Sequence, residues 1–153
     1  MKHFKLILLC ILFILQSCDL FMAGSYPYAE YYEFDTTKEE LIEKVNIFKE
    51  KNPTYKLFTY NKENREEVLG SYTENFYHFY FYFEDINQTI HCIININATK
   101  PVNIGLTAIS EGVIFAEWKD VNTKDLSKEE NKAIKKKFET EILDQLGEWK
   151  RCK

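Results

Sequence analysis

The chain has 153 residues and is moderately acidic, with 20 Lys and Arg against 24 Asp and Glu and a net charge of −4. This charge argues against a nucleic-acid partner, which would need a basic patch to neutralise phosphate groups. The length suits one domain with a sizeable core. No internal repeat, low-complexity tract or second domain is apparent.

The first 18 residues contain the parts of a secretory signal in the usual order. Lys2 and Lys5 form a short positive segment, and residues 6–15 are an unbroken apolar run. Ten residues are too few to span a membrane, which takes about 20. The run ends in Leu15-Gln16-Ser17-Cys18, which resembles the lipobox of bacterial lipoproteins, although Gln16 replaces the small residue more usual there. The alternatives are an ordinary secretory signal with a chance cysteine, or a buried N-terminal helix.

The resemblance implies that lipid is attached to Cys18 and that residues 1–17, the signal peptide, are removed. At about 0.8 kcal/mol per buried CH₂, two or three acyl chains would anchor the protein permanently. We therefore expect a lipid-anchored protein of the bacterial cell envelope, periplasmic or surface-exposed, with residues 18–27 as its tether. The mature chain would carry a net charge of −6, because the signal takes two lysines and no acid.

The first part of the domain, residues 28–153, predicts a strand and a helix. The tyrosine-rich segment 28–34 is typical of a strand. A capping box follows, either Thr36 with Glu39 or Thr37 with Glu40, and predicts a helix to about Lys51. Residues 55–60 predict a second strand, and the polar stretch 61–75 predicts a loop.

An aromatic strand, residues 76–83, occupies the centre of the sequence. Alternation places Tyr77, Phe79, Phe81 and Phe83 on one face. A four-residue loop at 85–88 would pair Phe83 with Ile90 and Phe81 with Cys92. This register makes the more apolar faces of the two strands coincide.

The remaining elements complete an α+β pattern. Residues 102–108 predict a strand, Ser110-Glu111-Gly112 a hairpin loop with glycine in the left-handed position, and residues 114–118 a returning strand with Trp118 in the core. Ser127 and Glu130 form a second capping box, before a helix that Gly147 ends. The order β-α-β-β-β-β-β-α predicts a two-layer sandwich, mainly antiparallel sheet with both helices packed on one face.

Two cysteines remain in the mature domain after the anchor. Cys92 and Cys152 would lie outside the cytosol, where disulfides form. A bridge between them could add about 4 kcal/mol in the chain-entropy model. Cys92 lies on the apolar side of its strand, so a buried free thiol is the alternative, and we favour it.

The sheet face opposite the helices is the candidate binding site. It is too aromatic for a plainly solvated surface, and large apolar patches often mark interaction sites. One alternative is that the chain itself or a second copy covers this face. The other is that these residues are there only because Tyr, Phe and Ile favour strands. A protein-binding face should be open, whereas cover by the chain's own residues would exclude that role. The candidate residues are Phe76, His78, Tyr80, Tyr82, His91, Ile93 and Phe115.

Catalytic and metal-binding patterns are lacking. The predicted register places His78 and His91 roughly 13 Å apart, which is too far for two ligands of one zinc ion. His91 and Cys92 point to opposite faces, and no nucleophile elbow, phosphate-binding loop or zinc-protease motif occurs. We expect no metal and no cofactor.

These features favour a non-enzymatic, membrane-anchored domain that binds another protein. One version is an immunity-type lipoprotein that masks an incoming toxin. A carrier of small apolar ligands is the alternative, and an enzyme with an unfamiliar carboxylate site is a weaker one.

Overall fold

The computed structural model describes residues 25–59, 66–113 and 117–152. The proposed signal peptide, Cys18 and Phe115 therefore lie outside the described residues. Within the described part, none of the helices combines the length and the apolar character needed to cross a membrane.

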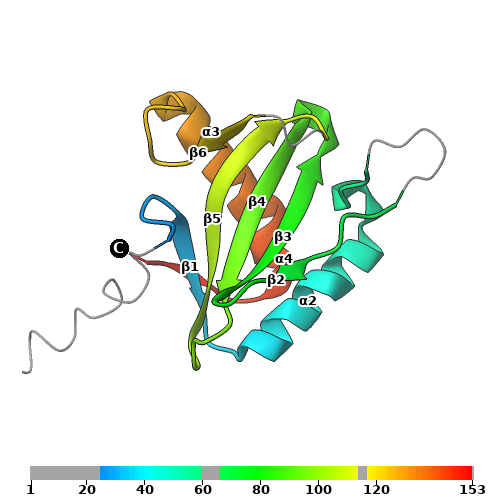
Figure 1. The fold of residues 1–153 in the computed structure, drawn as a ribbon, viewed down its shortest axis with the longest axis vertical. Coiled ribbons are helices and arrows are strands. Elements are labelled where there is room, and N and C mark those ends of the chain that lie inside the picture. Colours follow the sequence, from blue (N-terminus) through cyan, green and yellow to red (C-terminus); the bar gives the residue numbers. More distant parts are fainter. Residues whose placement is uncertain (1–24, 60–65, 114–116, 153) are drawn as a thin grey trace, which may run out of the picture.

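An antiparallel sheet forms one layer of the molecule (Figure 1). Its strand order is β2-β3-β4-β5-β1-β7, and β6 pairs with β5 beside β1. β2 to β5 form a meander. β1 pairs with the other side of β5, and β7 pairs with β1 at the edge of the sheet. The strands are β1 (Glu30–Phe34), β2 (Ser71–Tyr72), β3 (Phe76–Phe83), β4 (Gln88–Asn95), β5 (Val102–Glu111), β6 (Trp118–Asp120) and β7 (Lys150–Arg151).

Two helical segments begin at the predicted capping boxes. α2 (Lys38–Lys51) starts after Thr37, and α3 (Lys128–Phe138) starts after Ser127. α3 continues through a π-helical turn, η3 (Glu139–Leu143), into α4 (Asp144–Leu146). The buried residues of this segment recur every four positions, which exceeds the 3.6 residues of an α-helical turn. The wider π turn offsets that drift and keeps the apolar side chains on one face.

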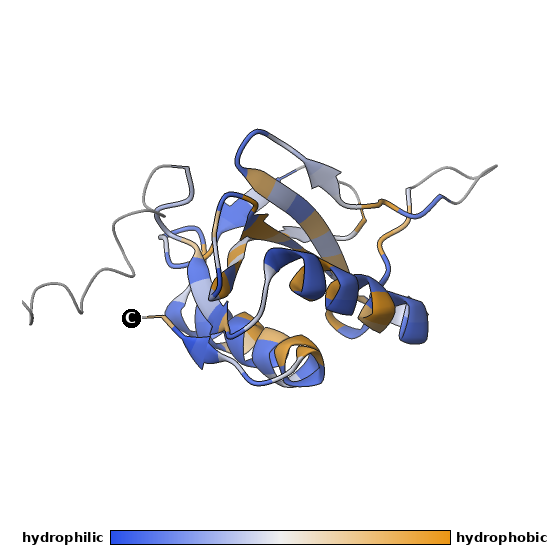
Figure 2. Cartoon of the chain, turned by 90° about the horizontal axis from the view of Figure 1, so that it is seen from below, coloured by the Kyte–Doolittle hydropathy of each residue, from blue (hydrophilic) through white to orange (hydrophobic). Residues whose placement is uncertain are grey.

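Both helices cover the same face of the sheet. The ring of Phe81, on β3, contacts Phe48 of α2 and Phe138 of α3, with ring centroids 5.9 and 6.2 Å apart. Figure 2 shows the helices on one side of the sheet, with apolar positions turned towards it. The predicted α+β fold with helices on one face is confirmed, and Tyr77, Phe79, Phe81 and Phe83 are buried as predicted.

The predicted strand at 55–60 is wrong over its described part. Residues 53–55 form a 3-10 turn, η1 (Pro53–Tyr55), and a single bridge joins Phe58 to Glu67. Leu57 is nevertheless fully buried, and its carbonyl accepts from the N–H of Val68. This segment pairs with residues 66–68 at the side of the sheet and is not one of its strands.

The predicted register of β3 and β4 is wrong by two residues. Phe83 lies opposite Gln88 and Phe79 lies opposite Cys92. The connecting turn begins one residue earlier than expected, with the 3-10 turn η2 (Glu84–Ile86), and Asn87 closes it in the left-handed conformation at φ 50°. A shift of two residues keeps every side chain on its predicted face, so the hydrophobic pattern does not detect it.

A β-bulge near the end of β5 changes which side chains face the core, and the predicted core position of Trp118 is wrong. Cys92 lies opposite Leu106 and His91 lies opposite Ala108, so Thr107 is the extra residue. Beyond the bulge the faces exchange, and Ile109 joins the core instead of Ala108. Trp118 pairs with Ser110 and contacts His91, so it lies outside the core. Gly112 has the predicted positive φ, at 71°.

No disulfide joins Cys92 to Cys152. Cys92 is completely buried on β4, and burial raises the pKa of its thiol well above the usual range. Cys152 follows β7, and its backbone N–H donates to Tyr31 of β1. Because β5 and β1 separate β4 from β7, neighbouring strands about 4.8 Å apart place the two positions too far apart for a bridge.

Candidate functional site

The sheet face opposite the helices, here called the outer face, carries the predicted binding residues. Phe76, His78, Tyr80 and Tyr82 of β3 are half-buried, as is His91 of β4. Ile93 is only 1% exposed, so it is not available to a partner.

Aromatic residues from other parts of the chain lie on the outer face. Tyr26, before β1, contacts Phe76 and His91 with ring centroids 5.4 and 6.0 Å apart. Trp118 of β6 contacts His91 at 5.7 Å and Tyr80 at 6.1 Å. The chain itself therefore covers the middle of this face, and the open surface expected for a partner-binding role is not found among these residues.

A glycine in the middle of β5 allows this cover to pack closely. A Cβ atom at Gly105 would lie 2.7 Å from the Tyr31 ring and 2.9 Å from the side chain of Ile93. Such distances are shorter than van der Waals contact, so any larger residue would push Tyr31 off the sheet. Burial of Tyr31 also raises the pKa of its hydroxyl to about 12.

A chain of hydrogen bonds links the two histidines. His78 Nδ1 lies 3.0 Å from His91 Nε2, and the rings are stacked. Thr107 Oγ1 donates to the His91 carbonyl and lies 2.7 Å from His91 Nδ1. With the Thr107 hydroxyl donating to the carbonyl, the neutral tautomer that completes this chain has Nδ1 of His91 donating to Thr107 and its Nε2 accepting from His78. The predicted separation of roughly 13 Å is therefore wrong, as a consequence of the register error.

Both imidazoles are held in the neutral form. Burial, with a smaller contribution from His78, lowers the pKa of His91 to about 4. Burial also lowers the pKa of His78. The pair is stabilised by hydrogen bonds that each neutral ring can complete, so its arrangement is explained by packing. Within the described ranges, no three His, Cys, Asp or Glu residues are grouped so that they could hold a metal ion.

A carboxylate cluster lies at the end of α3, where an unfamiliar enzyme site would be sought. Lys137 Nζ lies 2.7 Å from Asp85 and 2.6 Å from Glu141, and Tyr55 donates to Glu141. Lys137 lowers the pKa of Asp85, and the two carboxylates raise the pKa of Lys137. These directions are those of a stable ion network, whereas a general acid needs a raised carboxyl pKa. The cluster gives no support to the enzyme interpretation.

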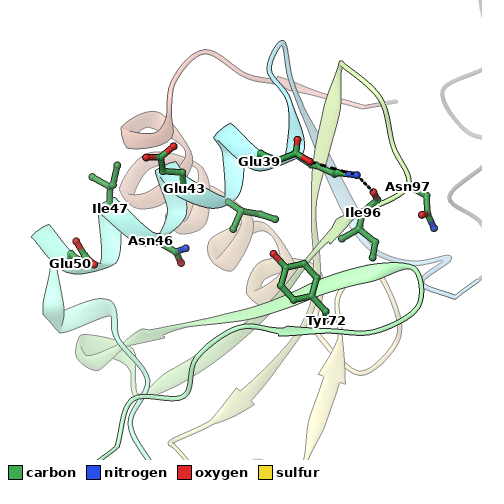
Figure 3. Close-up of a pocket in the computed structure, with 10 residues that line it drawn as sticks. Glu39, Glu43, Asn46, Ile47, Glu50, Tyr72, Ile96 and Asn97 are labelled. Carbon is green, nitrogen blue, oxygen red and sulfur yellow. Dashed lines mark hydrogen bonds and ion pairs between the residues drawn. The ribbon is translucent and has the colours of Figure 1, made fainter.

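A groove between α2 and the β2 edge of the sheet is the more open site (Figure 3). It has a volume of about 710 Å³. One wall is the exposed side of α2, and Tyr72 of β2 points across towards the helix. Ile96, after β4, lies at the end near Glu39. The lining residues are Lys38, Glu39, Ile42, Glu43, Asn46, Ile47, Glu50, Tyr72, Ile96 and Asn97.

Exposed apolar side chains gather along this groove, here called the α2–β2 groove. Tyr72 is 65% exposed and Ile47 is 40% exposed, and both line it. Leu69, which is 71% exposed, lines the hollow that continues it. The Tyr72 ring is held in place by Tyr77, with centroids 4.8 Å apart. The fold holds these side chains in position, and they remain exposed to solvent.

The polar features of the groove come from the helix and from the sheet edge. Glu39, Glu43 and Glu50 form a row along its α2 wall. β2 is the last strand of the sheet order among the described residues, so one edge of Ser71–Tyr72 pairs with no further strand. The site thus combines an apolar floor, an acidic wall and backbone groups able to pair.

The sequence pattern does not reveal this groove, because β2 has only two residues and follows a polar stretch. A signal was present, since Leu69 and Tyr72 are apolar residues in a segment that otherwise predicts a loop. Comparisons with protein-family models, curated proteins and solved structures found no match to this chain.

Proposed function

We propose that this protein is a lipid-anchored, non-catalytic domain of the bacterial cell envelope that binds another protein. The partner contributes an extended segment that lies in the α2–β2 groove. The exposed apolar residues of the groove are the observation that carries this proposal. Fully burying a side chain such as Ile47 or Leu69 is worth about 1.5–3 kcal/mol, so a partner gains most by covering them.

The shape of the groove suits an extended peptide. From Glu39 to Glu50 the helix wall runs for roughly 16 Å, at 1.5 Å per residue, which matches about five extended residues. Such a segment can pair with the free edge of β2 and thereby add a strand to the sheet. Its side chains would then alternate between the groove and solvent.

The negative charge of the α2 wall favours a partner segment with basic side chains. Glu39, Glu43 and Glu50 favour Lys or Arg at positions that face α2. Small apolar ligands prefer enclosed apolar pockets, so an open groove with a carboxylate wall supports the peptide interpretation over the carrier. The tether from Cys18 would keep this site within about 30 Å of the bilayer.

Selection from a peptide library tests the groove. The full chain, purified in detergent, is exposed to random nonapeptides, and the affinity of the enriched peptides is measured. We expect enrichment of apolar residues alternating with Lys or Arg, and at least tenfold weaker binding by Leu69→Asp. Ile86→Asp is the matched control, because Ile86 is 42% exposed but lies outside the groove. Equal loss of binding in both variants, or no enrichment, would contradict the proposal.

Fractionation tests the anchor. Cys18→Ser should move the protein from the membrane fraction to the soluble fraction, because the thioether that carries the lipid cannot form. Retention of the variant in the membrane would refute the lipobox interpretation.

A further inference from the structure

A lysine of α2, Lys49, lies beside the α2–β2 groove with its side chain almost completely buried. Lys49 is only 5% exposed, and its ammonium lies 5.4 Å from the centroid of the Phe81 ring. Within the part of the chain that the structure describes, no oxygen atom bonds to it. An ammonium on so buried a side chain keeps little of its hydration, and this loss is costly when no acceptor replaces it. A methionine would fill the same space without this cost, so packing alone does not explain the lysine.

Lys49 lines a hollow that continues the α2–β2 groove. This hollow has a volume of about 380 Å³. Ile42, Asn46, Glu50 and Tyr72 line both spaces, so one ligand can occupy them together. The side chains that line only the hollow are Lys49, Lys56, Glu67, Leu69, Gly70 and Tyr77.

Two lysines line the hollow, and of these Lys56 forms an ion pair within the described residues whereas Lys49 does not. Lys56 Nζ bonds to Glu67 Oε2 at 2.7 Å, and both side chains are 20% exposed. The Glu67 carboxylate is thus engaged by Lys56, while Glu50 stands exposed at the rim. Burial lowers the pKa of Lys49, and Glu67 partly offsets that effect.

We propose that Lys49 binds a carboxylate of the partner segment held in the groove, an inference that rests on the proposed function. The acceptor is either the C-terminal carboxylate of the segment or an Asp or Glu side chain near its end. In both cases a charge-assisted hydrogen bond satisfies the buried ammonium. The partner segment therefore carries basic residues along α2 and an acid group where it reaches Lys49.

The enriched nonapeptides provide the test. Each is compared with its C-terminally amidated form, and with forms in which Asp or Glu becomes Asn or Gln. One of these changes should weaken binding to the unaltered protein at least tenfold. The same change to the peptide should have no effect on binding to Lys49→Met. This variant should already bind the unmodified peptide as weakly as the unaltered protein binds the changed one. Lys51→Met, an exposed lysine of the same helix, is the control and should behave as the unaltered protein.

The outcomes separate the two claims. Peptides that bind Lys49→Met as tightly as the unaltered protein would overturn the role of Lys49 while the peptide groove stands. A library that yields no binder would overturn the proposed function and this inference together. A nuclear magnetic resonance measurement needs no variant: the Lys49 ammonium signal should shift and resist exchange when the peptide is added. An unchanged signal would overturn the inference.

Discussion

The outer face of the sheet and the α2–β2 groove both gather apolar and aromatic side chains, but they differ in what those side chains contact. On the outer face, Tyr26 and Trp118 cover the histidine pair, and Tyr31 packs over Gly105. In the groove and the hollow that continues it, Tyr72 and Leu69 remain mostly exposed. An aromatic surface that the chain covers itself is part of the folded structure, whereas one left in water is available to a partner.

This difference predicts opposite responses to mutation. Removal of an outer-face residue should reduce stability, because it removes contacts within the chain. Removal of a groove residue should leave stability nearly unchanged and affect binding alone. Four experiments test this contrast, from the largest expected effect on stability to the smallest.

Trp118→Ala should have the largest effect. Truncation of a buried Trp costs 3–5 kcal/mol, and Trp118 is half-buried, so a loss of about 2 kcal/mol in the free energy of unfolding is expected. Urea denaturation measures it. A loss below about 0.5 kcal/mol would mean that Trp118 does not hold the outer face together.

Gly105→Ala should destabilise the protein by about 1.5 kcal/mol, because the added methyl group collides with Tyr31 and Ile93. The same denaturation experiment checks it. Combining the change with Tyr31→Ala makes room for the methyl group, so the double variant should lose less than the sum of the single losses. Simple additivity would contradict close packing at this point.

Acidification should destabilise the protein through the histidine pair. The pKa of His91 is lowered in the folded state, to about 4 from an ordinary value near 6.5, so the unfolded state binds more protons between these values. Stability contributed by neutral His91 is therefore complete above about pH 6.5 and is lost as the pH falls towards 4. One group contributes a slope of at most about 1.4 kcal/mol per pH unit.

Urea denaturation at pH 7, 6 and 5 measures this slope, and His91→Gln should reduce it. Tyr26 and Tyr80 face His91 and remain neutral throughout this range. Glu40, Asp85 and Glu130 have lowered pKa values and act at lower pH. An unchanged slope in His91→Gln would contradict the buried neutral pair.

Leu69→Ala should have the smallest effect on stability, within about 0.5 kcal/mol, because the side chain is 71% exposed. The same variant should weaken binding of the enriched peptides. A large loss of stability would show that Leu69 belongs to the core and would remove the main support for an available groove.

The sequence was a good guide where a local pattern decides the structure. Thr37 and Ser127 begin their helices as predicted, because each capping box satisfies orphan N–H groups within four residues. The alternation of β3 correctly predicted its buried face, because side chains of a strand point to its two faces in turn.

Features that depend on pairing between strands were predicted poorly. Whether the turn begins at Glu84 or Asp85 changes the register by two residues while every residue keeps its face, and this decides whether His78 reaches His91. The bulge at Thr107 leaves no trace in the apolar pattern of β5. The groove was missed because it depends on how α2 packs beside the two-residue strand β2, which no local pattern encodes.

Mapping of bound peptide by nuclear magnetic resonance shows directly which of the two regions binds it. An enriched peptide is added to the isotopically labelled full chain, and changes in amide chemical shift are assigned. We expect the largest changes at Ser71, Tyr72 and along α2, with new protection of the β2 amides from hydrogen exchange. Changes centred on His78, Tyr80 and Trp118, with β2 unaffected, would contradict binding in the groove. They would indicate that the outer face binds the peptide.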